Sequence, residues 1–288
     1  RNDRQAYDNG NLPWYDYQGA SDEFSWQGNI DFDTHVLSLG AEYFNETMES
    51  ISSGISEIDT HALSYWLQDQ FFYGENLVLI AGARLDDHNT FGRKTTFRIA
   101  PAYEFPATHT RIKASFGTGF RSPSLYELYS EYGNPDLEPE KSRGWDLGVE
   151  QGLLNDRLTL GVTYWEMDFE NRIGYDWLIS KYNQLEGDTE TRGVEVFAAW
   201  TPVTDLSVNV NYTYTHTRDP EGNRLVRRPE NQVGLTASYR FLEKWQVGMD
   251  ARWVDERAAS PYALDKDGNP VGALDEYTVV NLSGSCDI

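Results

Sequence analysis

Apolar and polar side chains alternate along stretches of roughly ten residues throughout most of the chain. In Leu206–Thr217, the most regular stretch, Leu206, Val208 and Val210 share one face while Ser207 and its polar neighbours form the other. Successive side chains of a strand point to opposite faces, so a period of two predicts β-strands. The pattern predicts about 13 strands, over Glu23–Asp33, Val36–Phe44, His61–Tyr73, Asn76–Asp86, Thr95–Phe105, Arg111–Arg121, Gly144–Gly152, Leu158–Phe169, Thr191–Thr201, Leu206–Thr217, Gln232–Phe241, Trp245–Val254 and Tyr277–Ile288.

The connections between these strands alternate strictly between short and long. The short ones are Asp33–His35, Gly74–Glu75, Pro106–His109, Leu154–Arg157, Pro202–Asp205 and Leu242–Lys244. The long ones are Asn45–Thr60, Asp87–Lys94, Ser122–Arg143, Glu170–Glu190, Arg218–Asn231 and Asp255–Glu276. Transmembrane β-barrels have tight turns at the periplasmic end and long loops outside. The sequence therefore predicts an all-β fold, an antiparallel transmembrane β-barrel.

The two faces of the predicted strands differ in the way a membrane wall requires. Aromatic residues gather beside the short turns, as at Phe71, Tyr103, Trp200 and Phe241, and a belt of this kind is typical of a lipid–water interface. Charged residues project from the opposite face: Glu104, Arg111, Lys113, Arg121, Glu195, Arg240, Asp250 and Arg252. In a wide barrel this second face lines a wet or plugged lumen.

Composition excludes several functions. The net charge of −22 argues against a nucleic-acid partner, whose phosphates need Lys and Arg. The single cysteine, Cys286, excludes an internal disulfide, and the five histidines are too scattered to hold a metal. No nucleophile elbow is present, so we expect no enzyme. A passive porin, a barrel enzyme such as an outer-membrane lipase, and a soluble carbohydrate-binding β-protein stay open as alternatives.

One segment carries a family resemblance. It runs FGTGFRSPSLYELY from Phe116 and continues through the box NPDLEPE from Asn134. Both resemble the barrel of TonB-dependent outer-membrane receptors, with Ser122 and Asp136 replacing the usual Ala and Asn. Further agreement comes from Trp66–Gln70, Gly193–Glu195, Arg227–Pro229 and Tyr277–Gly284.

The resemblance implies a barrel of about 22 strands around an N-terminal plug, of which residues 1–288 are a partial barrel domain. The plug, the early strands and the last two strands would lie outside it, and Arg1–Asp22 would belong to an extracellular loop. The implied location is the outer membrane of a Gram-negative bacterium. The implied partners are outer-membrane lipid, the receptor's own plug, TonB with ExbB and ExbD acting through that plug, and a metal-chelate ligand.

The expected cargo depends on which receptors within the family the sequence resembles. The span from Phe120 to Leu137 and the region Leu225–Gln232 are similar to cobalamin receptors, so a corrinoid is the first expectation and a ferric siderophore the alternative. Ser124–Gly133 contains no histidine, which disfavours haem.

Candidate site residues lie in two long loops and on the polar face. We expect ligand capture by Tyr126, Tyr129, Tyr132, Asn134, Tyr175 and Trp177, because tyrosine and tryptophan combine apolar area with a polar tip. The alternative is that these rings pack on one another in a short helical lid. Arg121, Glu195 and Arg252 are expected to face the lumen and the plug.

No cofactor or metal is expected in this part of the receptor. Asp265–Asn269 with Glu276 has the spacing of a calcium loop, but Pro270 stands where that loop needs glycine. Calcium remains possible in loops of the full protein.

Overall fold

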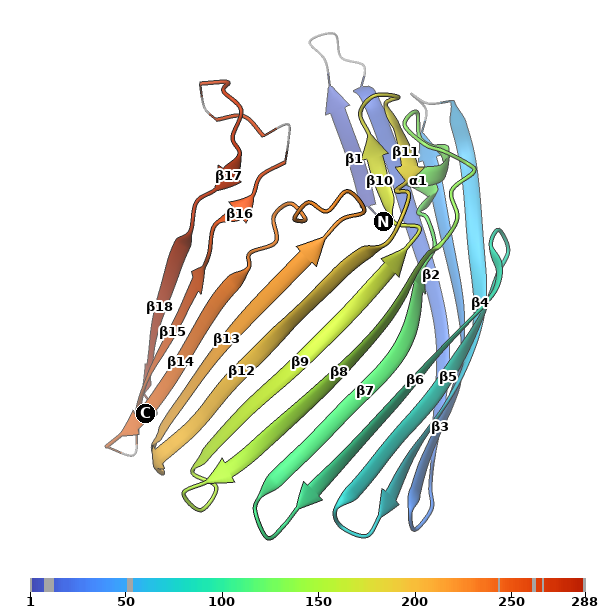
Figure 1. Ribbon diagram of the computed structural model, residues 1–288. Coiled ribbons are helices and arrows are strands. Elements are labelled where there is room, and N and C mark those ends of the chain that lie inside the picture. Colours follow the sequence, from blue (N-terminus) through green and yellow to red (C-terminus); the bar gives the residue numbers. More distant parts are fainter. Residues whose placement is uncertain are drawn as a thin grey trace.

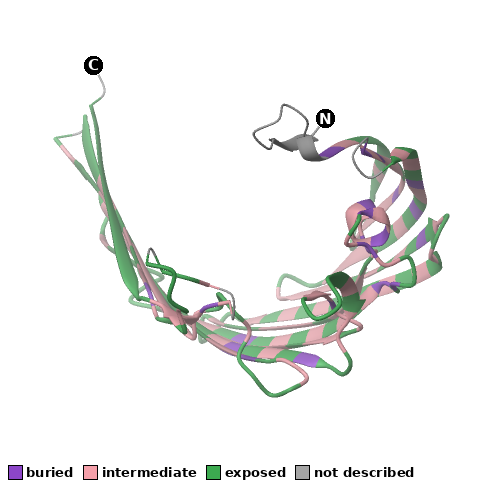
Figure 2. Cartoon of the chain, turned by 90° about the horizontal axis from the view of Figure 1, so that it is seen from above, coloured by how far each residue is buried: buried purple, intermediate pink, exposed green. Residues whose placement is uncertain are grey.

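The fold is one curved antiparallel sheet of 14 strands, in the order β1-β2-β3-β4-β5-β6-β7-β8-β9-β12-β13-β14-β15-β18 (Figure 1). The computed structural model describes residues 2–7, 13–50, 54–242, 244–260, 263–265 and 267–286, with the backbone alone at 2–7 and 13–15. The strands of this sheet are β1 (Asn2–Tyr7), β2 (Pro13–Asp31), β3 (His35–Ser50), β4 (Ile55–Tyr73), β5 (Leu77–His88), β6 (Gly92–Phe105), β7 (Thr110–Arg121), β8 (Glu140–Leu153), β9 (Leu158–Glu170), β12 (Thr189–Val203), β13 (Leu206–Arg218), β14 (Asn231–Phe241), β15 (Trp245–Val254) and β18 (Tyr277–Cys286). Seen from above, the sheet follows an arc with a concave and a convex face (Figure 2). The predicted all-β barrel architecture is confirmed.

Smaller elements lie in the long connections at one end of the sheet, opposite the short turns (Figure 1). They are the helix α1 (Leu125–Tyr129), the pair β10 (Ile173–Asp176) and β11 (Lys181–Gln184), and the pair β16 (Arg257–Ala258) and β17 (Ala273–Leu274). No helix in the described ranges is long and apolar enough to span a membrane.

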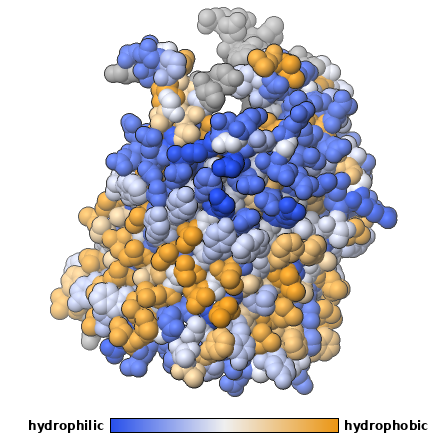
Figure 3. All heavy atoms as spheres, viewed as in Figure 1, coloured by the Kyte–Doolittle hydropathy of each residue, from blue (hydrophilic) through white to orange (hydrophobic). Residues whose placement is uncertain are grey.

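Strand register sorts the side chains as the period of two predicts. In β12 and β13, Val196 lies opposite Tyr212 and Ala198 opposite Val210, so one face of the pair is apolar. Large apolar side chains on this face remain exposed, for example Trp26 at 60% and Leu67 at 53%. An apolar face of this size in contact with water would be unusual, and it marks an interaction with lipid or protein. In Figure 3 these side chains form a band across the half of the molecule near the short turns, below a strongly hydrophilic zone.

The prediction that Arg1–Asp22 belong to a loop is wrong. Residues assigned to it form β1 and most of the upper part of β2, which pair from Asn2 opposite Gly19 to Tyr7 opposite Pro13. The connection Asn45–Thr60 is likewise mostly strand, since β3 and β4 remain paired as far as Ser50 and Ile55. Above the membrane the outer face of a strand contacts water instead of lipid, so these extensions lack the apolar stripe by which the membrane-spanning parts can be recognised.

Most apolar side chains point outward, so the packed interior is small and lies at the loop end. Two clusters form it: Tyr17, Met48 and Leu125, and Leu128, Leu137 and Ile173. The first cluster holds α1 against the extended ends of β3 and β4, and the second packs it against the loops that carry Leu137 and Ile173. Figure 2 shows the small helix inside the concave side of the sheet. The loop between β7 and β8 is therefore folded over the concave side of the sheet, at its loop end.

Candidate ligand-capture surface

The loop between β7 and β8 contains α1, and the N-terminus of this helix is capped by Ser124 and Glu127. The Glu127 N–H donates to Ser124 Oγ at 3.2 Å, and the Ser124 N–H donates to the Glu127 carboxylate at 2.8 Å. This reciprocal pair is a capping box, which satisfies two donors at the helix start. A five-residue helix has little stability of its own, so the cap and the packing of Leu125 and Leu128 fix it.

Arg121 anchors this helix to the wall. Its guanidinium donates to Glu127 at 2.9 Å and to both oxygens of Glu140 at 2.9 Å. Glu140 also accepts the backbone N–H of Ile173 at 2.7 Å. One arginine therefore joins the end of β7, the helix, the start of β8 and the loop that carries β10.

That second loop, residues 171–188, is bonded directly to the first. The Tyr182 N–H donates to the Tyr132 carbonyl at 2.8 Å, and Lys181 Nζ donates to the Gly133 carbonyl at 3.0 Å. The Gln184 side chain donates to the Glu138 carbonyl at 2.6 Å and accepts from its N–H at 3.1 Å. The two loops form a single folded unit.

Aromatic rings run through this unit in edge-to-face contact. We call the set Tyr17, Tyr126, Tyr132, Tyr175, Trp177 and Tyr182 the aromatic cluster. Tyr175 is its centre, with ring centroids 4.6 Å from Trp177, 5.4 Å from Tyr182 and 5.9 Å from Tyr132. Tyr126 continues the chain to Tyr182 at 6.0 Å and to Tyr17 at 4.8 Å. Such contacts combine ring packing with phenol groups that form hydrogen bonds.

The cluster unites four of the six predicted loop residues: Tyr126, Tyr132, Tyr175 and Trp177. Tyr129 instead packs against both small cores. Asn134 caps a turn, where its side chain accepts the Asp136 N–H at 3.0 Å. Two members of the cluster were not predicted from the sequence. Tyr17 lay in the segment assigned to a loop, and the available signal for Tyr182 was its position in the same loop as Tyr175.

Three phenols of the cluster, those of Tyr126, Tyr132 and Tyr182, stay protonated at neutral pH, because their surroundings raise the pKa of each. Burial raises the pKa of Tyr126 to about 12. Burial also raises the pKa of Tyr182, and a hydrogen bond with Glu131 raises that of Tyr132. A neutral phenol can donate one hydrogen bond and accept others, so the cluster offers polar tips and apolar ring faces together.

The three residues expected at the lumen differ in their surroundings. Arg121 is engaged with Glu127 and Glu140 in the loop anchor. Glu195 projects from the concave face of β12 between Thr163 and Thr213 of the neighbouring strands. Arg252, on the same face of β15, donates to the side-chain oxygen Oε1 of Gln232 at 2.5 Å. Contact with a plug remains a prediction for all three.

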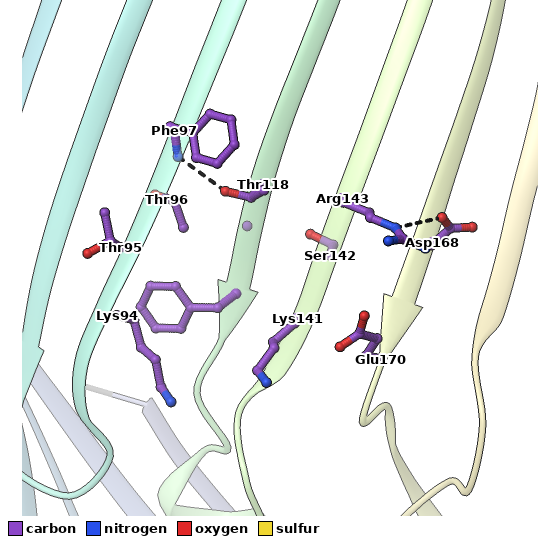
Figure 4. Close-up of a pocket in the computed structure, with 12 residues that line it drawn as sticks. Lys94, Thr95, Thr96, Phe97, Thr118, Lys141, Ser142, Arg143, Asp168 and Glu170 are labelled. Carbon is purple, nitrogen blue, oxygen red and sulfur yellow. Dashed lines mark hydrogen bonds and ion pairs between the residues drawn. The ribbon is translucent and has the colours of Figure 1, made fainter.

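A hollow of about 310 Å³ lies in the wall itself, apart from the aromatic cluster (Figure 4). Pairing of β6 with β7 ends at Arg98 opposite Gly117, so the strands separate above this point. The Phe97 N–H donates to Thr118 Oγ1 at 3.2 Å in place of a backbone acceptor. Arg143 and Asp168 form an ion pair of 3.0 Å beside the hollow.

In the segment with calcium-loop spacing, the Asp265 side chain forms hydrogen bonds with backbone groups of the same segment. The Asp265 carboxylate accepts the N–H groups of Asp267 and Asn269, each at 2.8 Å, and these bonds lower its pKa. Lys266 lies outside the described residues. In the described ranges, His, Cys, Asp and Glu side chains form no group of three or more that could hold a metal ion.

Comparison with known proteins agrees with this geometry. The family described as "TonB dependent receptor-like, beta-barrel" matches residues 1–288, and the chain belongs to that family. The family consists of transporters in the outer membrane of Gram-negative bacteria, which sets aside the barrel-enzyme and soluble-protein alternatives.

Solved structures share the fold at low identity. A mutant of the ferric enterobactin receptor from Pseudomonas aeruginosa is 17% identical with a TM-score of 0.81, over 95% of this chain and 47% of that one. The ferripyoverdine receptor of the same organism is 22% identical with a TM-score of 0.71, over 94% and 43%. A copper transporter is 15% identical with a TM-score of 0.77, over 98% and 52%. The chain thus spans about half the length of these proteins.

Proposed function

We propose that this chain forms the wall and the capture loops of a receptor for the energised uptake of a metal chelate. A ferric siderophore is the first candidate cargo. Family membership supports transport, and the neighbours named for ferric enterobactin and ferripyoverdine support an iron chelate over the corrinoid preferred from the sequence. The corrinoid remains the second candidate, on the motif around Arg121 and Asn134 alone.

The aromatic cluster is the observation that carries this proposal. A metal chelate is a large molecule with both apolar and polar edges, and binding sites for such molecules combine aromatic walls with a few polar groups. The cluster provides ring faces and neutral phenols on a loop unit that Arg121 fixes to the sheet.

The mechanism that the family implies has two stages. The loops capture the chelate first, and TonB, with ExbB and ExbD, then rearranges the plug through which the cargo passes. In this scheme Glu195 and Arg252 belong to the lumenal wall against which the plug rests.

Uptake by the full-length receptor tests the proposal. Cells that lack other iron receptors would express it, and uptake of ⁵⁵Fe-enterobactin, ⁵⁵Fe-pyoverdine and ⁵⁷Co-cobalamin would be compared with and without TonB. We expect TonB-dependent accumulation of an iron chelate. TonB-dependent accumulation of cobalamin alone would favour the corrinoid, and TonB-independent entry of all three would contradict the proposal.

Substitution of the central ring tests the role of the cluster. Because Tyr175 contacts three other rings, Tyr175→Ala should weaken binding of the transported chelate about tenfold, which corresponds to about 1.4 kcal/mol. Tyr103→Ala near the opposite end of the wall is the matched control, since Tyr103 packs edge-on to Phe105 and belongs to no loop. Equal affinity of the Tyr175 variant and the unmodified receptor would exclude the cluster from capture.

A further inference from the structure

A titratable pair interrupts the apolar convex face of the sheet. The imidazole Nδ1 of His35 in β3 lies 2.8 Å from the carboxylate Oδ2 of Asp69 in β4. Strand register places Asp69 between Leu37 of β3 and Ala81 of β5. Its side chain therefore projects from the same face as Leu67, which belongs to the apolar stripe of β4. We call His35 and Asp69 the convex-face pair.

The convex-face pair lies at the inner edge of the aromatic belt beside the short turns. His35 is opposite Phe71 in the register, and the centroids of the two rings are 4.8 Å apart. Phe71 in turn contacts Tyr73 at 6.5 Å, next to the turn that ends β4. Asp69 precedes Phe71 on the same face and lies further from the turn. Because the belt marks the lipid–water interface, the imidazole lies at the depth of the headgroups and the carboxylate just inside it.

The Asp69 carboxylate has fewer partners than its charge and position require. His35 supplies a hydrogen bond to Oδ2, whereas Oδ1 is buried without a hydrogen-bond partner in the described part of the chain. A carboxylate can accept about four such bonds. The side chains of His35 and Asp69 are still 41% and 37% exposed, so a ligand on the membrane side reaches the carboxylate through Oδ2. A charged group facing lipid costs free energy unless it is paired, and such a group is by default a candidate functional site.

Two further ion pairs of the convex face lie elsewhere, at its loop end. Arg93 bonds to Asp87 at 3.0 Å, and Arg143 bonds to Asp168 at 3.0 Å. Each joins a carboxylate to a guanidinium beyond the apolar stripe of its strands, where water can solvate both groups. The convex-face pair differs because it lies beside the short turns, between apolar neighbours, and because its basic member is an imidazole.

This chemistry fits the headgroup of a zwitterionic phospholipid. A primary ammonium group carries several N–H donors, and it forms strong charge-assisted hydrogen bonds with a carboxylate. A protonated imidazole donates from both ring nitrogens, so His35 can bind Asp69 through Nδ1 and a phosphate oxygen through Nε2. We propose that the convex-face pair binds a phospholipid with a primary ammonium headgroup, in the membrane leaflet at the short-turn end. Asp69 holds the ammonium group, and Leu37 and Ala81 contact the apolar part of the lipid.

The lipid selectivity of the full-length receptor tests this proposal. Native mass spectrometry would compare the binding of phosphatidylethanolamine with that of phosphatidylcholine of the same acyl chains, in which methyl groups replace the N–H donors. We expect the unmodified receptor to bind the first bound phosphatidylethanolamine about tenfold more tightly, because charge-assisted hydrogen bonds are the strong ones. Asp69→Asn should abolish the preference, and His35→Ala, which removes the residue that orients the carboxylate, should reduce it.

Asp87→Asn is the matched control, since it removes a convex-face carboxylate that lies at the loop end and already pairs with Arg93. Its preference for phosphatidylethanolamine should equal that of the unmodified receptor. Heat-modifiable migration on a gel would show that each variant is folded. Equal binding of the two lipids by the unmodified receptor would overturn the proposal, and so would an unchanged preference in the Asp69 variant.

A protein occupant of the same pair would give a different result. Sedimentation in detergent would show whether a second copy of the receptor binds through this face. A dimer that Asp69→Asn dissociates, in a receptor without preference for phosphatidylethanolamine, would overturn the lipid assignment in favour of a protein contact. None of these measurements depends on which chelate the receptor transports.

Discussion

Two residues determine much of the loop end, and both have several partners. Arg121 bonds to Glu127 and Glu140, whose side chains are only 15% and 16% exposed. Tyr175 contacts three rings. Sequence patterns identified both as candidates but gave them simple roles, because alternation shows which face a residue occupies and not which distant loop it contacts.

Loss of Arg121 should loosen both loops. In Arg121→Gln two largely buried carboxylates lose their partner, so the local opening free energy should fall by about 1–3 kcal/mol. Amide hydrogen exchange of Leu125–Tyr129 and of Ile173 measures it. Arg93→Gln is the control, since the Arg93–Asp87 pair is exposed and should contribute at most about 1 kcal/mol. Unchanged exchange in the Arg121 variant would mean that packing alone holds the loops.

Tyr126 makes the loop unit sensitive to alkali. Burial raises its pKa to about 12 in the folded state, so the folded protein keeps a proton that the unfolded chain loses near pH 10. The stabilisation is complete below pH 10 and is lost as the pH rises to about 12. Tyrosinate absorbance of the full-length receptor should show a late component that Tyr126→Phe removes. A late component of the same size in that variant would contradict the assignment.

Individual strands show which elements of the fold could be predicted from the sequence. The alternation of apolar and polar residues in β13 and β14 was sufficient to locate both strands within a few residues, because one face of each strand contacts the hydrocarbon chains of the lipid. The upper parts of β2, β3 and β4 were missed, since the outer faces of strands that extend beyond the membrane contact water instead of lipid. The pairs β10–β11 and β16–β17 are too short for any period to be visible.

The pairing of β6 with β7 does not extend over the full length of the two strands. Backbone pairing ends at Arg98 and Gly117, and Thr118 Oγ1 accepts the Phe97 N–H instead. Thr118→Val should remove this acceptor and accelerate hydrogen exchange at Phe97. The control is Thr191→Val, whose hydroxyl donates to the Met167 carbonyl and protects no amide. If Phe97 exchanged at the same rate in both variants, another group would have to protect it.

At the scale of the molecule, the sheet places its apolar residues on the convex side and its charges on the concave side. Figure 3 shows the apolar band of the convex face near the short turns. This arrangement reverses that of a soluble protein, where apolar side chains meet inside. The sequence predicted it from alternation and loop lengths. It could not predict that the loops after β7 and β9 form one unit, because contacts such as that of the Tyr182 N–H with the Tyr132 carbonyl exist only in the folded sheet.

The most direct test of the account is the environment of alternate side chains along one strand. In the full-length receptor in liposomes, with Cys286 replaced by serine, spin labels would be placed one at a time at positions 207 to 212 of β13. Labels at positions 208, 210 and 212 should collide with oxygen dissolved in lipid, and labels at 207, 209 and 211 with a water-soluble nickel complex. A strand without this alternation, or with the water-soluble reagent at the apolar positions, would contradict a lipid-facing wall.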